Sequence, residues 1–461
     1  MFEANVYRRR RHILQQKIRS GLIVFLGNDE VPMNYTANAY HFRQDSSFLY
    51  FFGLDMPGLA AVLDVDERKA TLFGDDISLE DIIWMGHLPN LKDRARLSGM
   101  AATAPAAKLE AVIRRARAKG RTVHFLPPYR PEISAKLSRL LGIAPRNLKA
   151  RASSELIRAV VSQRLVKSAP EVREIEKALA VTHRMYLAAM KTVKPGVLEQ
   201  EVVGRMDGLA LAGGAGTAFP TILTINGQIL HNHDHSHIMR KGRLLVVDSG
   251  AESNRHYASD ITRTLPVSGK FTTRQREIYE IVLAAQESAI AAMKPGLPFR
   301  DVHLKVARLM SAGLKEVGLM KGDTEEAVAA GAHALFFPHG LGHPLGLDVH
   351  DMENLGESFI GYDEKTKRSD QFGLAYLRFA RELRPGYVMT VEPGIYFIPA
   401  LVAKWKKEKK HTSFINYLKV QTYLNFGGIR IEDNVLITSG GRRVLGQPIP
   451  KRVKDVERLM A

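Results

Sequence analysis

Four carboxylates and one histidine occupy apolar or glycine-rich stretches of the sequence, where an unpaired charge would be costly. They are Asp248, Asp260, His343, Glu392 and Glu432. Taken one at a time, each acid could cap a turn at the end of a strand or form half of an ion pair. Taken together, several carboxylates can share a small apolar space only when cations hold them, and two divalent ions about 3.5 to 4 Å apart do this. Because most of these donors are hard oxygens, we expect Mn²⁺, with Co²⁺ or Zn²⁺ as alternatives.

Two of the acids, Asp248 and Glu392, lie in segments with the same layout. Residues 242–250 and 386–394 each begin with a glycine, carry an acid six residues later and end with a second glycine. Two amphipathic helices also stop at the same turn, Lys-Pro-Gly, at positions 194–196 and 294–296. The turns are 100 residues apart and the acids 144, so a duplication would have been interrupted by insertions. Such a duplication predicts two similar halves that face each other and supply acids to one site.

Helix signals mark where the second domain begins. Ser168 with Glu171, and Thr272 with Gln275, match the capping-box pattern that starts a helix. Before the first of these, strand-like runs alternate with helices, as in a single α/β domain. We therefore expect an N-terminal α/β domain over residues 1–160 and a second domain over residues 161–461.

The composition excludes several classes of protein. There is no cysteine, which excludes disulfides, thiolate metal sites and a cysteine nucleophile. No apolar run approaches the roughly 20 residues of a membrane span, and no signal-peptide core is present, so we expect a soluble cytoplasmic protein. The formal charge of +18 includes clusters at residues 8–11 and 404–410. Without an interleaved aromatic groove or a DNA-binding pattern, we interpret them as solvated surface and expect neither nucleic acid nor membrane as a partner.

The motifs around the five candidate ligands resemble one metallopeptidase family, the pita-bread family that holds methionine aminopeptidase, aminopeptidase P and prolidase. The matching motifs are His-Gly-Leu-Gly-His at 339–343, Leu-Asp-Val-His-Asp at 347–351, Thr-Val-Glu-Pro-Gly-Ile-Tyr at 390–396 and Gly-Gly-Ile-Arg-Ile-Glu-Asp at 427–433. Residues 42–48 similarly resemble the first domain of aminopeptidase P and prolidase. The resemblance implies an α+β chain, in which an N-terminal α/β domain precedes a pseudo-two-fold catalytic domain with a curved antiparallel sheet covered by helices.

The resemblance also assigns roles to individual residues. The five candidates would be the ligands of a dinuclear centre, with Asp260 and Glu432 bridging the ions and Glu392 moving a proton. The other expected catalytic residues are His231, His339, His350 and Arg430, and the expected substrate-binding residues are His231, His350 and Arg378. His339 could instead be a structural residue that orients His343. The neighbouring His233, His235 and His237 are expected to be exposed loop residues.

The activity implied is hydrolysis of the Xaa-Pro bond at the N-terminus of peptides by a metal-activated hydroxide. Arg378 and the long insert at 397–426 resemble prolidase, in which an arginine clamps the carboxylate of a dipeptide. An Xaa-Pro aminopeptidase that acts on longer peptides is the alternative, and a non-catalytic binding module of the same fold is a remote one. Pro344 and residues 352–354 depart from the family pattern and could reshape the pocket. The N-terminal domain of related proteins joins subunits, so we expect a homodimer or homotetramer.

Overall fold

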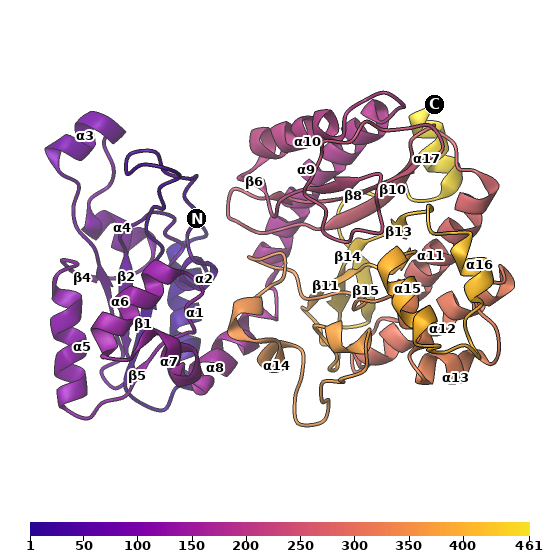
Figure 1. Cartoon of the computed structure of the whole chain (residues 1–461). Helices are drawn as coiled ribbons and strands as arrows, with labels where there is room; N and C mark the ends of the chain where they lie inside the picture. The colour runs from indigo at the N-terminus through magenta and orange to yellow at the C-terminus, as the bar shows by residue number, and fades with distance from the viewer. The chain divides into compact units, whose positions relative to one another are not determined.

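The computed structural model describes all 461 residues. Contacts within the chain divide it into two compact units (Figure 1). The first unit contains Met1–Arg164 and the short segment Met352–Phe359, and the second contains Leu165–Asp351 and Ile360–Ala461. The sequence gives no sign that residues 352–359 belong with the N-terminal residues. None of the helices combines the length and the hydrophobicity needed to cross a membrane.

The first unit is built on a mixed five-stranded sheet. Its strand order is β4-β3-β2-β1-β5, with β1 parallel to β5, β3 parallel to β4 and the other pairs antiparallel. The strands are β1 (Leu22–Leu26), β2 (Ala60–Asp64), β3 (Lys69–Phe73), β4 (Ala102–Ala104) and β5 (Val123–His124). All five residues of β1 are apolar and buried, as expected for a strand covered on both faces.

Helices surround this sheet. They are α1 (Ala4–Lys17), α2 (Ser46–Phe52), α3 (Leu79–Met85), α4 (Leu91–Leu97), α5 (Lys108–Ala118), α6 (Pro131–Leu141), α7 (Pro145–Arg151) and α8 (Ser154–Arg164). Residues 352–359 add η2 (Glu353–Leu355) and the start of α14 (Glu357–Ile360). Apolar residues of α5, α6 and α7 recur at helical spacing and pack against β1 and β2 in one core. In contrast, α3 buries none of its residues.

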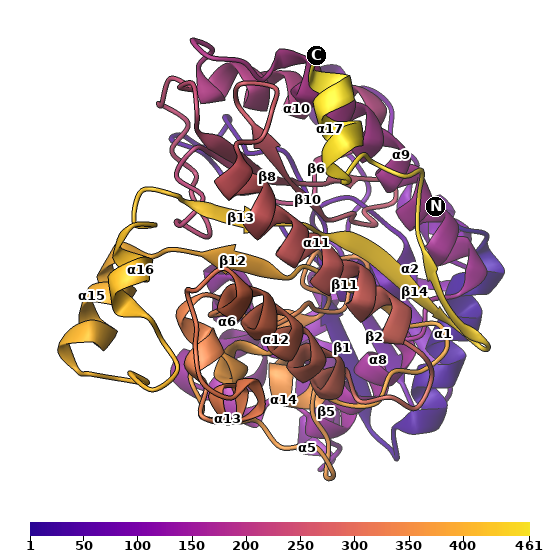
Figure 2. The ribbon, with the colours of Figure 1, turned by 90° about the vertical axis from the view of Figure 1, so that its right-hand side faces the viewer.

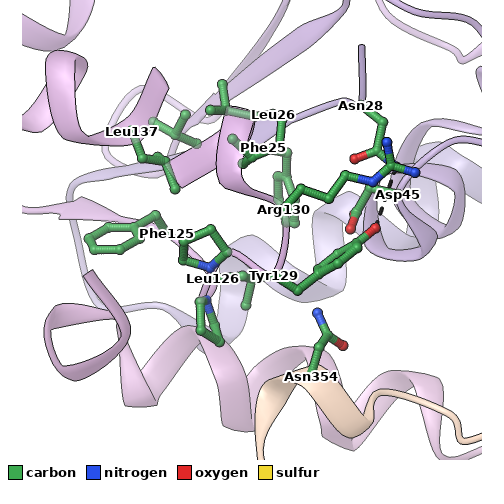
Figure 3. A pocket seen from close by; sticks show the side chains of 14 residues that line it. Phe25, Leu26, Asn28, Asp45, Phe125, Leu126, Tyr129, Arg130, Leu137 and Asn354 are labelled. Atoms are coloured by element: carbon green, nitrogen blue, oxygen red, sulfur yellow. Dashed lines mark hydrogen bonds between the residues drawn. The ribbon is translucent and has the colours of Figure 1, made fainter. Parts of the chain in front are cut away.

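A small pocket lies beside the carboxyl ends of the parallel strands β1 and β5 (Figure 3). Phe25, Phe125 and Leu137 form its apolar side, and Asn28 and Tyr129 lie at its polar side. Its volume of about 40 Å³ is enough for a water molecule. The pocket is therefore too small for an organic ligand.

The second unit consists of antiparallel strands with helices packed on them (Figure 2). Its strands are β6 (Gly216–Thr217), β7 (Ile222–Thr224), β8 (Leu244–Ser249), β9 (Ala251–Glu252), β10 (Ile261–Pro266), β11 (Val388–Val391), β12 (Gly394–Tyr396), β13 (Gly428–Arg430), β14 (Asp433–Thr438) and β15 (Gly441–Val444). The larger sheets have the orders β10-β8-β7 and β11-β14-β15, and β12 pairs with β13 and β6 with β9. Every one of these pairs is antiparallel, which confirms the expected α+β class.

Two long helix pairs cover these strands. The helices of the unit are α9 (Ala169–Thr192), α10 (Glu199–Gly213), α11 (Thr273–Ala292), α12 (Phe299–Glu316), α13 (Thr324–Ala329), α15 (Pro399–Lys407), α16 (Tyr417–Gln421) and α17 (Val453–Met460), with the 3-10 turns η1 (Ala332–Leu335) and η3 (Leu374–Tyr376). The capping boxes form as predicted: the Ser168 amide donates to the carboxylate of Glu171 (2.9 Å), and the Thr272 amide to the side chain of Gln275 (3.0 Å).

The duplication inferred from the sequence reappears in the backbone hydrogen bonds. The amide of Gly196 donates to the carbonyl of Met239, and that of Gly296 donates to the carbonyl of Leu383, each at 2.9 Å. The donors are 100 residues apart and the acceptors 144, the same two offsets as in the sequence. The next bonds repeat the match, from Glu199 to His237 and from Phe299 to Arg381, each at 3.0 Å. The two halves of this unit therefore share one local architecture.

One buried arginine ties these halves together. Arg263 on β10 is 1% exposed and lies 2.7 Å from Asp433 on β14. It also donates to the carbonyls of Thr262 (2.9 Å) and Glu432 (2.6 Å). Burial alone would raise the pKa of Asp433, but Arg263 and Lys451 outweigh it and lower that pKa to about 2. Asp433 is therefore a buried anion that depends on its cations.

We predict that Arg263→Met lowers the free energy of unfolding by about 3–5 kcal/mol, because it leaves Asp433 buried beside a single cation. Lys451→Met is the matched control. Lys451 also lies 2.6 Å from Asp433, but its side chain is 21% exposed and Arg263 remains in that variant, so the loss should be about 1 kcal/mol. Urea unfolding followed by circular dichroism measures both. Equal losses in the two variants would contradict this account.

Candidate metal centre

The four acids stand at equivalent positions in the two halves. Asp248 lies near the end of β8 and Asp260 directly precedes β10, which pairs with β8. In the other half Glu392 directly follows β11 and Glu432 directly precedes β14, which pairs with β11. Since paired antiparallel strands run in opposite directions, the end of one strand lies beside the start of the next. Each half thus presents two carboxylates at one end of a strand pair.

These carboxylates meet around His343. Ligand atoms of Asp260, His343 and Glu432 all lie within 4.8 Å of one another. Nε2 of His343 is 3.4 Å from Asp260 Oδ2 and 3.6 Å from Glu392 Oε1. His343 is held against β11, because its amide donates to Thr390 Oγ1 (3.0 Å) and its carbonyl accepts from the Thr390 amide (2.9 Å). The structure therefore brings residues from both halves into one cluster, as the sequence predicted.

Each half also holds the acid of the other half in place. The Thr262 hydroxyl donates to Glu432 Oε2 (2.7 Å), and the Glu432 amide donates to the Thr262 carbonyl (3.0 Å). Reciprocally, the Asp260 amide donates to Asn434 Oδ1 (3.1 Å), and Asn434 Nδ2 donates to the Asp260 carbonyl (2.5 Å). Thr262 and Asn434 each stand two residues after an acid. We refer to these four residues as the reciprocal clasp.

Three carboxylate oxygens of the cluster have no hydrogen-bond partner in the protein. They are Asp248 Oδ1, Asp260 Oδ1 and Glu432 Oε1, and all three are buried. Burial, together with the neighbouring carboxylates, raises the pKa of Asp260 and Glu432 well above the usual range and that of Glu392 to about 8. Buried carboxylate oxygens without hydrogen-bond donors are suitable ligands for divalent cations. Such cations would coordinate these oxygens and balance the negative charge of the carboxylates.

A hydrogen-bonded chain of side chains backs the cluster. Arg430 donates to Asp248 Oδ2 (2.6 Å), to Thr262 Oγ1 (3.1 Å) and to the hydroxyl of Tyr396 (2.9 Å). That hydroxyl lies 2.9 Å from Nε2 of His339, whose Nδ1 faces the Gly340 carbonyl at 2.8 Å. Arg430 thus leaves Asp248 Oδ1 available to a ligand while it holds the other oxygen.

The cluster forms one side of a cavity of about 500 Å³. All ten residues predicted from the sequence line it: the four acids and His343 of the cluster, with His231, His339, His350, Arg378 and Arg430. Apolar side chains line it as well, among them Phe219, Ile222, Leu230, Phe372, Ile398 and Leu401. The last two belong to the insert at 397–426. Pro344 and residues 352–354 do not line this cavity, so their departures from the family pattern lie outside its wall.

The histidines after His231 differ from expectation. His235 Nδ1 lies 3.0 Å from the Leu223 carbonyl, and His237 Nδ1 lies 3.3 Å from the buried carboxylate of Glu199. Both rings are half-buried, so the prediction that they are exposed was wrong. His233 is exposed, as predicted, but it also lines the cavity. His231, His233, His235 and His237 are two residues apart, a spacing that places side chains on one face of an extended segment. The prediction overlooked that this face could be partly buried.

Sequence reasoning also missed Thr262, Asn434 and Tyr396. Thr262 lies two residues after Asp260, Asn434 two residues after Glu432, and Tyr396 two residues after Gly394. Residues two apart in a strand lie on the same face of the sheet. That period of two was the available signal. It could not show that Thr262 reaches Glu432, 170 residues away.

Comparison with known proteins identifies this architecture. Residues 173–439 match the family model described as metallopeptidase family M24, and residues 7–124 match the aminopeptidase P N-terminal domain. The chain belongs to metallopeptidase family M24. The expected pita-bread membership is thereby confirmed.

The similar proteins carry two different names, Xaa-Pro aminopeptidase and Xaa-Pro dipeptidase. It is 32% identical to a probable Xaa-Pro aminopeptidase of Sordaria macrospora, over 96% of this chain and 91% of that protein. It is 31% identical to the human Xaa-Pro dipeptidase, over 96% of this chain and 90% of that protein. A solved structure of an Escherichia coli aminopeptidase P variant in complex with substrate has a TM-score of 0.81 and 29% identity, and covers 100% of this chain and 98% of that chain.

For this M24 metallopeptidase we predict that Thr262→Val lowers the affinity for Mn²⁺ by about 10- to 100-fold, because it removes the donor that orients Glu432. Thr192→Val is the control: it removes another buried hydroxyl, which donates to the Ala188 carbonyl (2.9 Å) and accepts from Arg205 (3.3 Å), and neither partner belongs to the cluster. Isothermal titration of metal-free protein with Mn²⁺ measures both variants. A wild-type affinity in Thr262→Val would show that the clasp does not position the ligand.

Proposed function

We propose that this protein hydrolyses the Xaa-Pro bond at the N-terminus of peptides, and acts best on Xaa-Pro dipeptides. The observation that carries the proposal is the cluster of four acids and His343 at one side of a cavity whose wall also contains Arg378. Relatives named Xaa-Pro dipeptidase and Xaa-Pro aminopeptidase, at 31% and 32% identity over 96% of the chain, support the same bond specificity.

In this proposal Asp248, Asp260, His343, Glu392 and Glu432 would hold two divalent ions. Mn²⁺ suits a donor set with a single nitrogen better than zinc does, although Co²⁺ or Zn²⁺ could replace it. When bound, such ions polarise a carbonyl and lower the pKa of water, so that hydroxide is available near neutral pH. The buried oxygens without partners support this assignment.

Glu392 is the acid best placed to move a proton. Its side chain is 18% exposed, against 12% for Asp248 and 7% for Asp260, so it is the most accessible of these three acids from the cavity. A carboxylate in that position can take a proton from the attacking water and deliver it to the departing proline nitrogen. That nitrogen must be protonated before it leaves, because the amine is the stable product.

Two imidazoles of the cavity, those of His231 and His339, favour the neutral form. Burial, and after it the charge of Arg430, lowers the pKa of His231, and the same two causes lower that of His339 to about 3. A neutral His339 must donate from Nδ1 to the Gly340 carbonyl, so its Nε2 accepts from Tyr396. Both of its nitrogens are then used. We propose that His339 and Arg430 position the site, while His231 and His350 face the developing oxyanion.

Arg378 provides the preference for dipeptides in this proposal. Its half-buried guanidinium lines the cavity and would form a bidentate pair with the free carboxylate of Xaa-Pro. In longer peptides that carboxylate is replaced by an amide, which offers no charge to the arginine. An Xaa-Pro aminopeptidase is the second candidate, because relatives and solved structures with that activity in their names match over nearly the whole chain.

The expected homodimer or homotetramer stays a prediction. The exposed side chains of α3, including Leu79 (73%), Ile83 (70%) and Trp84 (77%), give a surface on which subunits could associate. Multi-angle light scattering of Trp84→Glu beside the unmodified chain would test this, since a monomeric unmodified chain refutes it.

We predict that Glu392→Gln lowers kcat by about 10²- to 10⁴-fold while KM changes by less than about fivefold, because the amide cannot accept the proton. Metal content is measured alongside by mass spectrometry, which separates loss of proton transfer from loss of an ion. An unchanged kcat in a fully loaded variant would exclude Glu392 as the proton carrier.

For Arg378→Gln we predict that kcat/KM with Ala-Pro falls about 10²- to 10³-fold, the cost of leaving a buried carboxylate without its partner, and that hydrolysis of Ala-Pro-Ala changes by less than about fivefold. Arg381→Gln is the matched control, because Arg381 is near in sequence but donates to the Tyr387 hydroxyl (3.2 Å) and does not line the cavity. Equal losses with both substrates would favour the aminopeptidase.

A further inference from the structure

The first unit contains a second hollow, separate from the small pocket of Figure 3, with a volume of about 420 Å³. Arg117, Arg121 and Arg151 line it together with Asn147. Arg117 lies at the end of α5, and Asn147 and Arg151 lie on α7. Phe125, Leu141 and Ile143 give the hollow an apolar part. Its size is that of a small-molecule site, and none of its residues has a role in the proposed peptidase.

Positive charge is concentrated around this hollow. Residues 108–151 contain twelve lysines and arginines but only two acids, a net +10 out of +18 for the whole chain. This stretch comprises α5, β5, α6 and α7, which lie beside one another in Figure 1. More than half of the net charge of the protein thus falls on a tenth of its length. A solvated surface does not require such a concentration.

Two of the three arginines in the hollow are not neutralised. Arg121 lies 2.5 Å from Asp64 and 2.6 Å from Asp66, so its charge is balanced. The side chains of Arg117 and Arg151 form no hydrogen bond or ion pair with the protein, and the side-chain amide of Asn147 also has no protein partner. Both arginines are exposed, so the hollow presents two guanidinium groups that no carboxylate of the protein balances. An anion bound to both would gain charge-assisted hydrogen bonds.

The scaffold holds these side chains on rigid elements. Leu109 and Ile113 of α5, Leu137 of α6 and Leu148 of α7 are buried in the core beneath, each at most 4% exposed. The inner faces of the three helices are thus fixed, while Arg117 of α5 and Arg151 of α7 are exposed on the side of the hollow. A site on packed helices loses less conformational freedom on binding than a site on loops.

We propose that this hollow binds a small organic phosphate, such as a phosphate monoester. Arg117 and Arg151 supply two charges, which match a dianion, and the planar guanidinium pairs with phosphate through two parallel hydrogen bonds. The apolar part of the hollow, formed by Phe125, Leu141 and Ile143, accommodates the organic group. Inorganic phosphate would fill only the charged part. This proposal is independent of the peptidase activity.

The test is isothermal titration of the full-length protein with inorganic phosphate, phenyl phosphate and AMP at about 150 mM chloride, where long-range attraction is screened. We expect the organic phosphates to bind at least about fivefold more tightly than inorganic phosphate, because they also bury apolar surface. The double variant Arg117→Gln/Arg151→Gln should lose about 30-fold or more in affinity.

The matched control is Arg114→Gln/Arg146→Gln. It removes two charges from the same helices, α5 and α7, but neither residue lines the hollow, so the affinity should fall by less than about threefold. Equal losses of affinity in the two double variants would overturn the proposal, because they would show nonspecific attraction by the positive surface charge. Binding of single-stranded RNA or of phosphatidylserine vesicles without binding of organic phosphate would also overturn it, as would the absence of saturable binding.

Discussion

Four carboxylates close together and away from water repel one another, and the rest of the second unit can be understood as the means of keeping them there. Burial and mutual repulsion raise the pKa of Asp260, Glu392 and Glu432, so the protein alone does not favour their charged forms. Backbone amides, Thr262, Asn434 and Arg430 fix the positions of the acids without neutralising all of their oxygens. The arrangement of the cluster therefore suits cations.

The duplicated architecture explains how one chain achieves this arrangement. Each half contributes two acids at one end of a strand pair, and the clasp lets Thr262 of one half orient Glu432 of the other. Neither half can position its own acids completely. Folding of the halves is thus coupled to assembly of the site, and Arg263, which bonds to backbone and side chain of the opposite half, provides much of that coupling.

The sequence was sufficient for features that depend on local pattern and insufficient for those that depend on distant partners. Capping boxes located α9 and α11, the repeated glycine-acid layout located the ends of β8 and β11, and all the predicted site residues line one cavity. The partners of Asp260 and Glu432 were missed, because a hydroxyl or amide two residues along a strand has no signal of its own. The hollow beside Arg117 was missed for a similar reason: charge counts do not show which arginines lack a carboxylate. The grouping of residues 352–359 with the N-terminal residues was not foreseen, since no pattern in them indicates which core they join.

Residues 352–359 determine how the protein can be divided into fragments. Because residues 352–359 pack with the N-terminal residues, the chain crosses between its two units three times rather than once. Met352 and Leu355 are 0% and 2% exposed, so they are part of a hydrophobic interior. A fragment that stops at Arg164 would lack a piece of its own interior, and a fragment that starts at Leu165 would carry that piece exposed to water. Exchange of N-terminal domains between relatives would accordingly require that residues 1–164 and 352–359 be exchanged together, with one cut after Arg164 and two more on either side of the second segment.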